Sequence, residues 1–266
     1  MRDFFGSIGS AAAFLFAGVA RLFGLFARVS SAALFSGAAK KPTRHNAVFH
    51  QMVLSGVDSL PIICLVGCSM GMVLALQGAY QLKQFGAVMY TGSLVSVSVA
   101  RELGPLMAAI VIAGRIGARM AAEIGTMKVQ EEVDALTTMG LDPIRLLVVP
   151  RCLALCFTLP CLVIVTDVVA MIGGFVIGVL SVGINPDLYI SKSFDALVLK
   201  DIYTGLAKSF LFAALIGLVS CHQGLSVEGG ADEVGRATTQ AVVTSIVLII
   251  VVDCLATAVF YYALPS

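Results

Sequence analysis

The sequence predicts an all-α membrane protein with an N-terminal interfacial amphipathic helix, five transmembrane helices and a cytoplasmic helix between the second and third of them. The first observation is composition: the 266-residue chain is 59% hydrophobic and 12% charged, whereas soluble domains contain about 25% charged residues. The second is that five apolar stretches approach or exceed the roughly 20 residues that cross a bilayer. The third is a net charge of only +1, which argues against nucleic acid as a partner.

Residues 1–45 form a first unit, an amphipathic helix followed by a basic linker. Within residues 4–35, apolar side chains recur alternately four and three positions apart and draw one stripe along a helix, with Arg21 and Arg28 on another face. This pattern predicts a helix that lies in the cytoplasmic headgroup layer. A spanning helix is the alternative. A cleaved signal peptide is disfavoured because the arginines follow the apolar core.

The first two spanning segments are predicted at about 52–80 and 90–114. The first carries glycines near one helix face, which suit close packing against another helix. The second holds Arg101 and Glu102 near its middle, where each charge costs about 2.5–3.5 kcal/mol on insertion scales. These side chains must pair, reach water or contact a polar ligand. Pro105, just beyond them, is expected to bend or break the helix.

The other three spanning segments of the transmembrane domain, which covers residues 46–266, are predicted at about 152–181, 204–222 and 241–263. Each of them contains an ionisable residue, namely Asp167, Lys208 and Asp253 in turn. Ionisable residues within a membrane face the bundle interior and usually mark a functional site. The sequence assigns no role to Asp167.

Positive charge gathers in segments 40–45 and 115–151, whereas 81–89 and 182–203 carry little excess. Cytoplasmic loops carry the excess of lysine and arginine in membrane proteins. The N-terminus and the 115–151 hairpin are therefore predicted to lie in the cytoplasm, and five crossings place the C-terminus outside.

The polar hairpin contains a short helix predicted at about 127–140. Its apolar and small residues share one narrow face, its acidic residues favour the start of a helix, and Gly140 and Pro143 end it. We interpret this helix as a docking surface that couples the membrane domain to a soluble partner, with a merely solvated loop helix as the alternative. The residues expected to carry the contact are Glu131, Glu132, Val133, Asp134, Leu136 and Met139.

The sequence supplies no catalytic chemistry of its own. It lacks the G-x-x-x-x-G-K-[ST] phosphate loop and the H-E-x-x-H and G-x-S-x-G motifs, so the chain is predicted not to be an enzyme. The C-x-x-x-C pairs at 64/68 and 152/156 lack histidine or carboxylate neighbours, and no metal site is predicted. Two functions remain: a permease driven by a separate ATPase, and an ion- or proton-coupled carrier. The carrier would use Glu102, Asp167, Lys208 and Asp253.

One long motif resembles a known family. The run RELGPLMAAIVIAGRIGARMAAEIGTM at 101–127, followed by EEVDAL, MGLDP and PR, is similar to the MlaE/YrbE permeases of Mla- and Mce-type ABC lipid transporters. GMVLALQG at 71–78 and GRATTQAVV at 235–243 extend the likeness, which covers roughly residues 45–262.

The resemblance implies a homodimer with five spanning helices and one interfacial helix in each subunit. It implies two ATPase subunits beneath the dimer, which bind the ATP, so that the permease itself holds no cofactor. An MCE-domain ring is implied on the outer side, and some such systems add a STAS-domain protein. The implied substrates are lipids, most often phospholipids, moved between the inner (plasma) membrane and an outer envelope layer.

The resemblance also implies roles for individual residues. Side chains from the GMVLALQG motif and just beyond it, together with the charged pair of RELGP, would line a lipid cavity at the dimer interface. The alternative for the apolar members is ordinary helix packing, and for the charged pair it is holding helices together. Lys208 and Asp253 would form an internal charge pair. The implied cavity residues are Leu74, Gln77, Gly78, Leu82, Phe85, Arg101 and Glu102.

Overall fold

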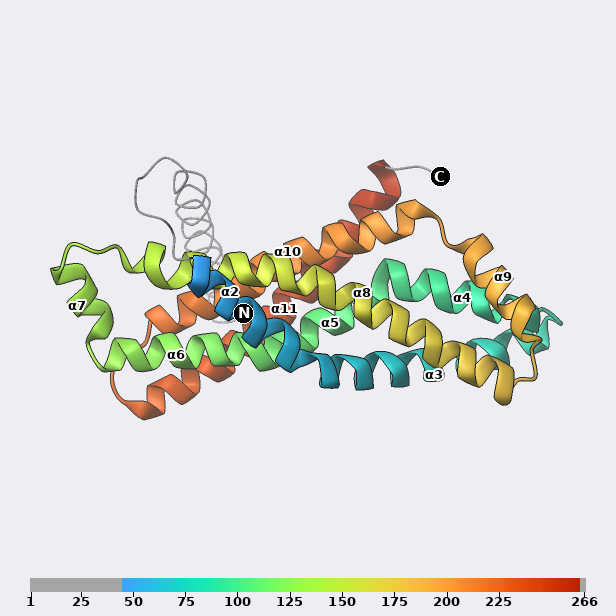
Figure 1. The fold of residues 1–266 in the computed structure, drawn as a ribbon, viewed down its shortest axis with the longest axis horizontal. Coiled ribbons are helices and arrows are strands. Elements are labelled where there is room, and N and C mark those ends of the chain that lie inside the picture. Colours follow the sequence, from blue (N-terminus) through green and yellow to red (C-terminus); the bar gives the residue numbers. More distant parts are fainter. Residues whose placement is uncertain (1–44, 264–266) are drawn as a thin grey trace, which may run out of the picture.

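The computed structural model describes residues 45–263, which form helices joined by short loops. The molecule is elongated, with α7 (Glu132–Thr138) at one end and α4 (Thr91–Ser98) and α9 (Pro186–Ala196) at the other (Figure 1). Within the described range, five apolar helical rods are long enough to cross a membrane. The predicted all-α membrane fold is confirmed there, whereas the helix predicted at 4–35 lies outside the described residues.

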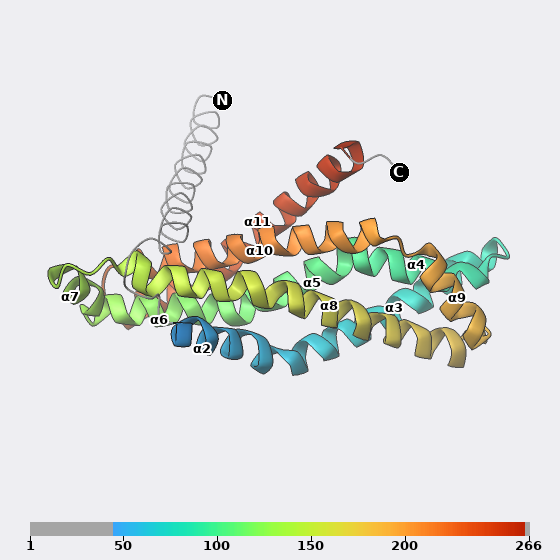
Figure 2. The same ribbon diagram turned by 45° about the horizontal axis from the view of Figure 1, so that its top comes forward.

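The first rod is bent. It consists of α2 (His45–Gly56), a single 3₁₀ turn η1 (Val57–Ser59) and α3 (Leu60–Gln84). Pro61 stands at the start of α3 and cannot donate a hydrogen bond to the preceding turn. The rod changes direction between α2 and α3 (Figure 2), and both segments pack against α8.

The second rod contains two π-helical turns. These turns have one more residue per hydrogen-bonded ring than an α-helix and occur often at functional sites. The first turn ends just before Pro105, so the helix widens and continues at the point where the sequence predicted a bend or a break. After a 3₁₀ turn, η2 (Val88–Tyr90), the elements of the rod are α4, η3 (Val99–Leu103), α5 (Gly104–Ile112), η4 (Ala113–Gly117) and α6 (Ala118–Val129).

The second rod also runs further than predicted, to Val129 instead of about residue 114. Arg115 and Arg119 are exposed, while Met120 and Ile124 on another face are buried. The charges that suggested a loop therefore lie on the outer face of a helix. At about 1.5 Å per residue, its 42 residues are roughly twice as long as a hydrocarbon core of about 30 Å, so part of α6 extends beyond the membrane.

The remaining rods complete the bundle. The third combines the π-helical turn η5 (Ile144–Val148) with α8 (Val149–Leu180), and the fourth and fifth are α10 (Leu199–Leu225) and α11 (Ala231–Ala263). The end of α11 diverges from the other helices (Figure 2). The core lies where α5, α6, α8, α10 and α11 meet, and its large side chains are Ile112, Met120, Leu155, Leu159, Phe212, Ile216 and Ile249.

The helices α3 and α8 approach each other at backbone distance. A Cβ atom added at Gly71 would overlap the carbonyl group of Ala170, and one added at Gly173 would overlap that of Cys68. Membrane helices associate through close van der Waals packing because lipid provides no hydrophobic drive between them. The glycines in α3 therefore allow the contact that the sequence predicted for its glycine face.

Candidate functional site: a charged cluster between the membrane helices

Four polar side chains from three rods meet inside the bundle. Lys208 in α10 is 1% exposed. Its Nζ atom contacts a carboxylate oxygen of Glu102 in η3 and lies 3.0 Å from Asp253 Oδ1 in α11. Lys208 also donates a hydrogen bond of 2.7 Å to Thr257 Oγ1, and that hydroxyl lies 3.1 Å from Glu102 Oε1. One ammonium thus contacts two carboxylates and ties the second, fourth and fifth rods together.

A second ion pair lies beside the first. Arg101 pairs through its Nε atom with Asp201 at the start of α10, and the side chain of Asp201 is 1% exposed whereas that of Arg101 is 51% exposed. Asp201 Oδ2 also accepts a hydrogen bond of 3.2 Å from the backbone N–H of Val198. Asp201 is therefore held from two sides, while part of the Arg101 guanidinium faces outward.

The π-helical turn η3 explains how adjacent residues reach the same neighbouring helix. Arg101 and Glu102 do not pair with each other; each pairs with a residue of α10. Their partners Asp201 and Lys208 are seven positions apart, so they lie on one face of α10. The cost of a charge within the membrane predicted that Arg101 and Glu102 both have partners. In the structure both partners lie on α10.

The structure brings together three of the four residues considered for ion coupling. Glu102, Lys208 and Asp253 are in contact, but the ion pairs of the described residues do not include Asp167. Asp167 projects from α8 against Gly104, and its Oδ1 atom is buried without a hydrogen-bond partner.

The residues expected to line a lipid cavity divide into two groups on α3 and just after it. Leu74 packs against the buried cluster of Ala75, Val95, Val99 and Ala170, and Gly78 is buried against Leu94. Leu82 is half-buried, while Gln77 and Phe85 are exposed. The exposed residues continue a largely apolar face that the sequence analysis did not identify in full, which also includes Val73, Leu76 and Tyr80.

Two members of the charged cluster were missed by the sequence analysis. Asp201 stands seven residues before Lys208, and Thr257 follows Asp253 by one helical turn. Polar residues at that spacing share the face of a helix that already carries a charge. This spacing is a signal that could have identified both residues.

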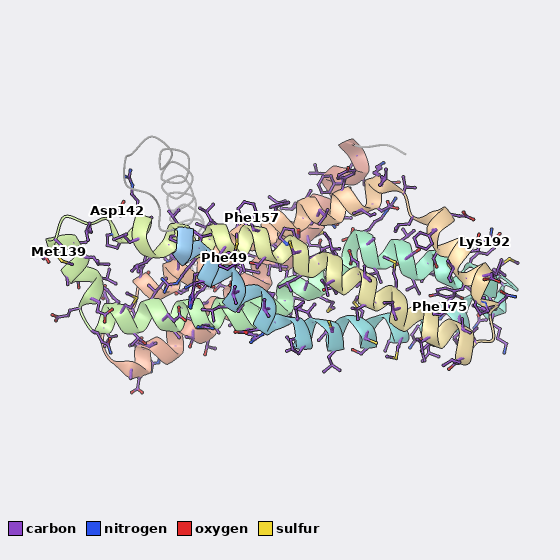
Figure 3. All side chains as sticks on the ribbon, in the orientation of Figure 1. Phe49, Met139, Asp142, Phe157, Phe175 and Lys192 are labelled. Carbon is purple, nitrogen blue, oxygen red and sulfur yellow. The ribbon has the colours of Figure 1, made fainter. Side chains whose placement is uncertain are left out.

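The structure divides the range 127–140, predicted as a single helix, between the end of α6 and α7. The chain leaves α6 at Val129, and Glu131 adopts a left-handed conformation with φ of 60° before α7 begins. Val133 is buried, Leu136 is half-buried, and Glu131, Glu132 and Met139 are exposed. Asp134 is bound by Lys128, with Nζ 2.7 Å from Oδ1. Met139 and Asp142 lie at the end of the molecule formed by this hairpin (Figure 3).

A pocket of about 440 Å³ lies elsewhere, between α8 and α9. Tyr189 lines it, and the ring of this tyrosine packs edge-on against Phe175 with centroids 5.7 Å apart. Burial raises the pKa of Tyr189 to about 12, so its hydroxyl remains protonated at neutral pH. Ser93 and Ser96 in α4 donate hydrogen bonds to backbone oxygens of α9, which fixes this helix in place.

Comparison with known proteins identifies the family of this chain. A family model described as Permease MlaE matches residues 48–259. A protein of Rickettsia typhi named "Probable ABC transporter permease protein" is 40% identical over 238 residues, which cover 90% of this chain and 92% of the relative. A protein of Synechocystis with the same description is 41% identical over 201 residues, 76% of each chain.

A plant protein is also similar. The Arabidopsis thaliana protein named "Protein TRIGALACTOSYLDIACYLGLYCEROL 1, chloroplastic" is 35% identical over 211 residues, which cover 79% of this chain and 60% of the plant protein. The family match extends across the five described rods. The chain therefore belongs to the MlaE permease family and is a multi-pass membrane permease of an ABC transporter.

Proposed function

We propose that this permease moves phospholipids or related lipids between the inner membrane and an outer envelope layer. The observation that carries the proposal is the exposed, largely apolar face of α3, which continues to Phe85 directly after the helix, a residue that is 80% exposed. A protein surface in contact with water rarely exposes such an apolar face, whereas a lipid chain or a second subunit would cover it. The name of the plant relative refers to a glycolipid, which is consistent with a lipid substrate.

The proposed path for the lipid runs along this face. Gln77, Leu82 and Phe85 would line it, with the apolar side chains against the lipid tail and the Gln77 amide as a polar contact. Leu74 and Gly78 would form the packed layer behind them. Arg101 and Glu102 would lie near its floor. The half-exposed guanidinium of Arg101 is suited to an anionic head group because it can donate several hydrogen bonds to phosphate.

Energy for transport would come from a separate ATPase that binds the ATP. The sequence has no phosphate-binding loop, so a motor subunit is required. We propose that it docks on α7 and the residues around it, where Glu131, Glu132 and Met139 are exposed at one end of the molecule (Figure 3). Membership of an ABC permease family sets aside the alternative of an ion- or proton-coupled carrier.

The remaining partners follow from the same proposal. The permease would act as a homodimer in the inner membrane, with its N-terminus and α7 in the cytoplasm. The exposed apolar residues of α11, such as Val243, Val247 and Ile250, are suited to contact with a second copy. An MCE-domain ring would cover the outer end, and a STAS-domain protein would join the ATPase.

The proposal is tested by reconstituting the permease with its ATPase in liposomes and measuring the ATP-dependent transfer of labelled phospholipid. We expect Glu102→Gln to impair transfer while the ATPase still co-purifies. Replacing Glu131, Glu132 and Asp134 together by arginine should release the ATPase. Asp187→Asn, an exposed change on α9, is the control. Full transfer by the Glu102 variant, or an unchanged complex in the triple variant, would contradict the assigned role.

A further inference from the structure

The pocket between α8 and α9 is separate from the proposed lipid path. None of the seven residues expected to line that path is among those that line the pocket. Its volume of about 440 Å³ falls within the range of about 300–1,000 Å³ that is common for small-molecule sites. Most of its wall is apolar. Its lining residues include Ala100, Asp167, Val168, Ile172, Tyr189 and Phe194.

The pocket opens toward the side of the bundle. Val168 and Ile172, one turn apart on α8, are about half exposed, and Phe194 on α9 is 73% exposed. In a membrane these side chains would face hydrocarbon and not water. A ligand could therefore enter from the bilayer, and its apolar part would rest against α8 and α9.

Two buried polar atoms in the pocket have no hydrogen-bond partner. They are Oδ1 of Asp167 and the hydroxyl of Tyr189, a residue that is 3% exposed. The Tyr189 hydroxyl lies beside Gly174, seven residues after Asp167 on α8, so the two polar positions are about 10 Å apart along the helix. Buried polar groups without partners are rare and costly, which suggests that a ligand completes them.

The charges of the pocket restrict the chemistry of this ligand. Asp167 contributes a carboxyl group to the wall, but no lysine or arginine is among the lining residues in the described chain. An anionic head group such as a phosphate or a fatty-acid carboxylate would find no cation there to compensate its charge. A hydroxyl group can instead donate a hydrogen bond to Asp167 without bringing a charge into the membrane.

We propose that this pocket binds a neutral, long-chain amphiphile whose hydroxyl group donates to Asp167 and whose hydrocarbon chain lies between α8 and α9. A second polar group further along the amphiphile would contact the Tyr189 hydroxyl. The ligand also touches Ala100 in η3, the turn that carries Arg101 and Glu102. The site is thus placed to influence the charged cluster, and it does not depend on which lipid is transported.

Photo-crosslinking tests this assignment on the full chain in phosphatidylcholine nanodiscs. Three diazirine probes with the same hydrocarbon chain would be compared: a long-chain alcohol, its methyl ether and the corresponding carboxylic acid. We expect the alcohol to label peptides of α8 and α9 about tenfold more than the ether or the acid, since only the alcohol can donate a hydrogen bond to Asp167 without carrying a charge into the membrane. Unlabelled alcohol should compete, and unlabelled ether should not.

Two variants test which residue causes the preference for the alcohol probe. Asp167→Leu should remove the preference for the alcohol, whereas Asp187→Asn on α9 should leave it unchanged. If Asp167→Leu does not fold, the competition experiment on the unaltered chain still decides. Equal labelling by the three probes, or a preference that survives Asp167→Leu, would show contact with adventitious bilayer lipid only and would overturn the proposal.

Discussion

Lys208 Nζ lies 3.0 Å from Asp253 Oδ1, and this contact joins α10 to α11 within the membrane-spanning part of the bundle. The same ammonium contacts Glu102 of the second rod. Because the lysine is buried, its charge is compensated by these carboxylates and not by water. The cluster therefore links the π-helical turn η3 to the helix whose end diverges from the bundle.

Lys208→Met should destabilise the protein strongly. The change leaves two carboxylates close together without a cation, and removal of one partner from a buried ion pair typically costs about 3–5 kcal/mol. Thermal unfolding of the detergent-purified chain measures the effect. Lys83→Met, at an exposed position near the end of α3, is the matched control. Equal melting temperatures for the two variants would show that the cluster contributes little to stability.

Gly71→Ala should also destabilise the protein, because the new methyl group overlaps the Ala170 carbonyl and forces α3 away from α8. Overpacking typically costs about 1–3 kcal/mol. At Gly235 in α11, an added methyl group meets no neighbouring atom within 4 Å, so Gly235→Ala should be neutral or slightly stabilising. Unfolding curves of the two variants measure these changes in stability. An unchanged stability of Gly71→Ala would argue against backbone contact between α3 and α8.

Glu123→Gln should loosen the contact between α6 and α8. Glu123 accepts hydrogen bonds from Arg119 and from the buried Arg151, at 2.7 and 3.1 Å. Loss of its charge leaves Arg151 without its ionic partner. Glu233→Gln, which removes only an exposed pair with Arg236, should cost less than about 1 kcal/mol. Limited proteolysis of the 130–145 segment and the melting temperature compare Glu123→Gln with Glu233→Gln. Similar behaviour of the two variants would contradict the prediction.

Arg101→Ala should destabilise the protein more than Asp201→Ala. The first change leaves the Asp201 carboxylate, whose side chain is 1% exposed, without its cation, whereas the second leaves only the half-exposed Arg101 guanidinium and the N–H of the exposed Val198, which can be solvated. The expected difference is about 1–3 kcal/mol, the usual penalty for a buried group left unsatisfied. Unfolding measurements on the two single variants and the double variant separate the ion pair from the hydrogen bond of the Val198 backbone. A larger effect at Asp201 would reverse this explanation.

The number of spanning helices could be predicted from the sequence because each is a long apolar run. Their ends could not be predicted as well. Arg115 and Arg119 resemble a loop in the sequence, but a helix can carry arginines along one face while Met120 is buried on another. The left-handed conformation of Glu131 has no sequence signal either, since that conformation is expected of glycine or asparagine.

The site was only partly accessible to sequence reasoning. The cost of a charge in the membrane indicated that Arg101 and Glu102 needed partners, but not which ones. Their partners Asp201 and Lys208 are 100 and 106 positions away, and such pairing depends on how the rods pack. Asp167 remained without a role because its surroundings are formed by a neighbouring rod and by α9.

The backbone contact between α3 and α8 restricts how this molecule can change shape. Where glycines bring the two backbones together, at Gly71 and Gly173, a displacement of one helix along the other brings backbone atoms into collision. This pair is therefore expected to behave as a fixed frame during a transport cycle. Any alternation between inward- and outward-open states would then fall to helices outside the pair, such as the far end of α11, which diverges from the bundle (Figure 2) beyond the contact of Asp253 with Lys208 of α10.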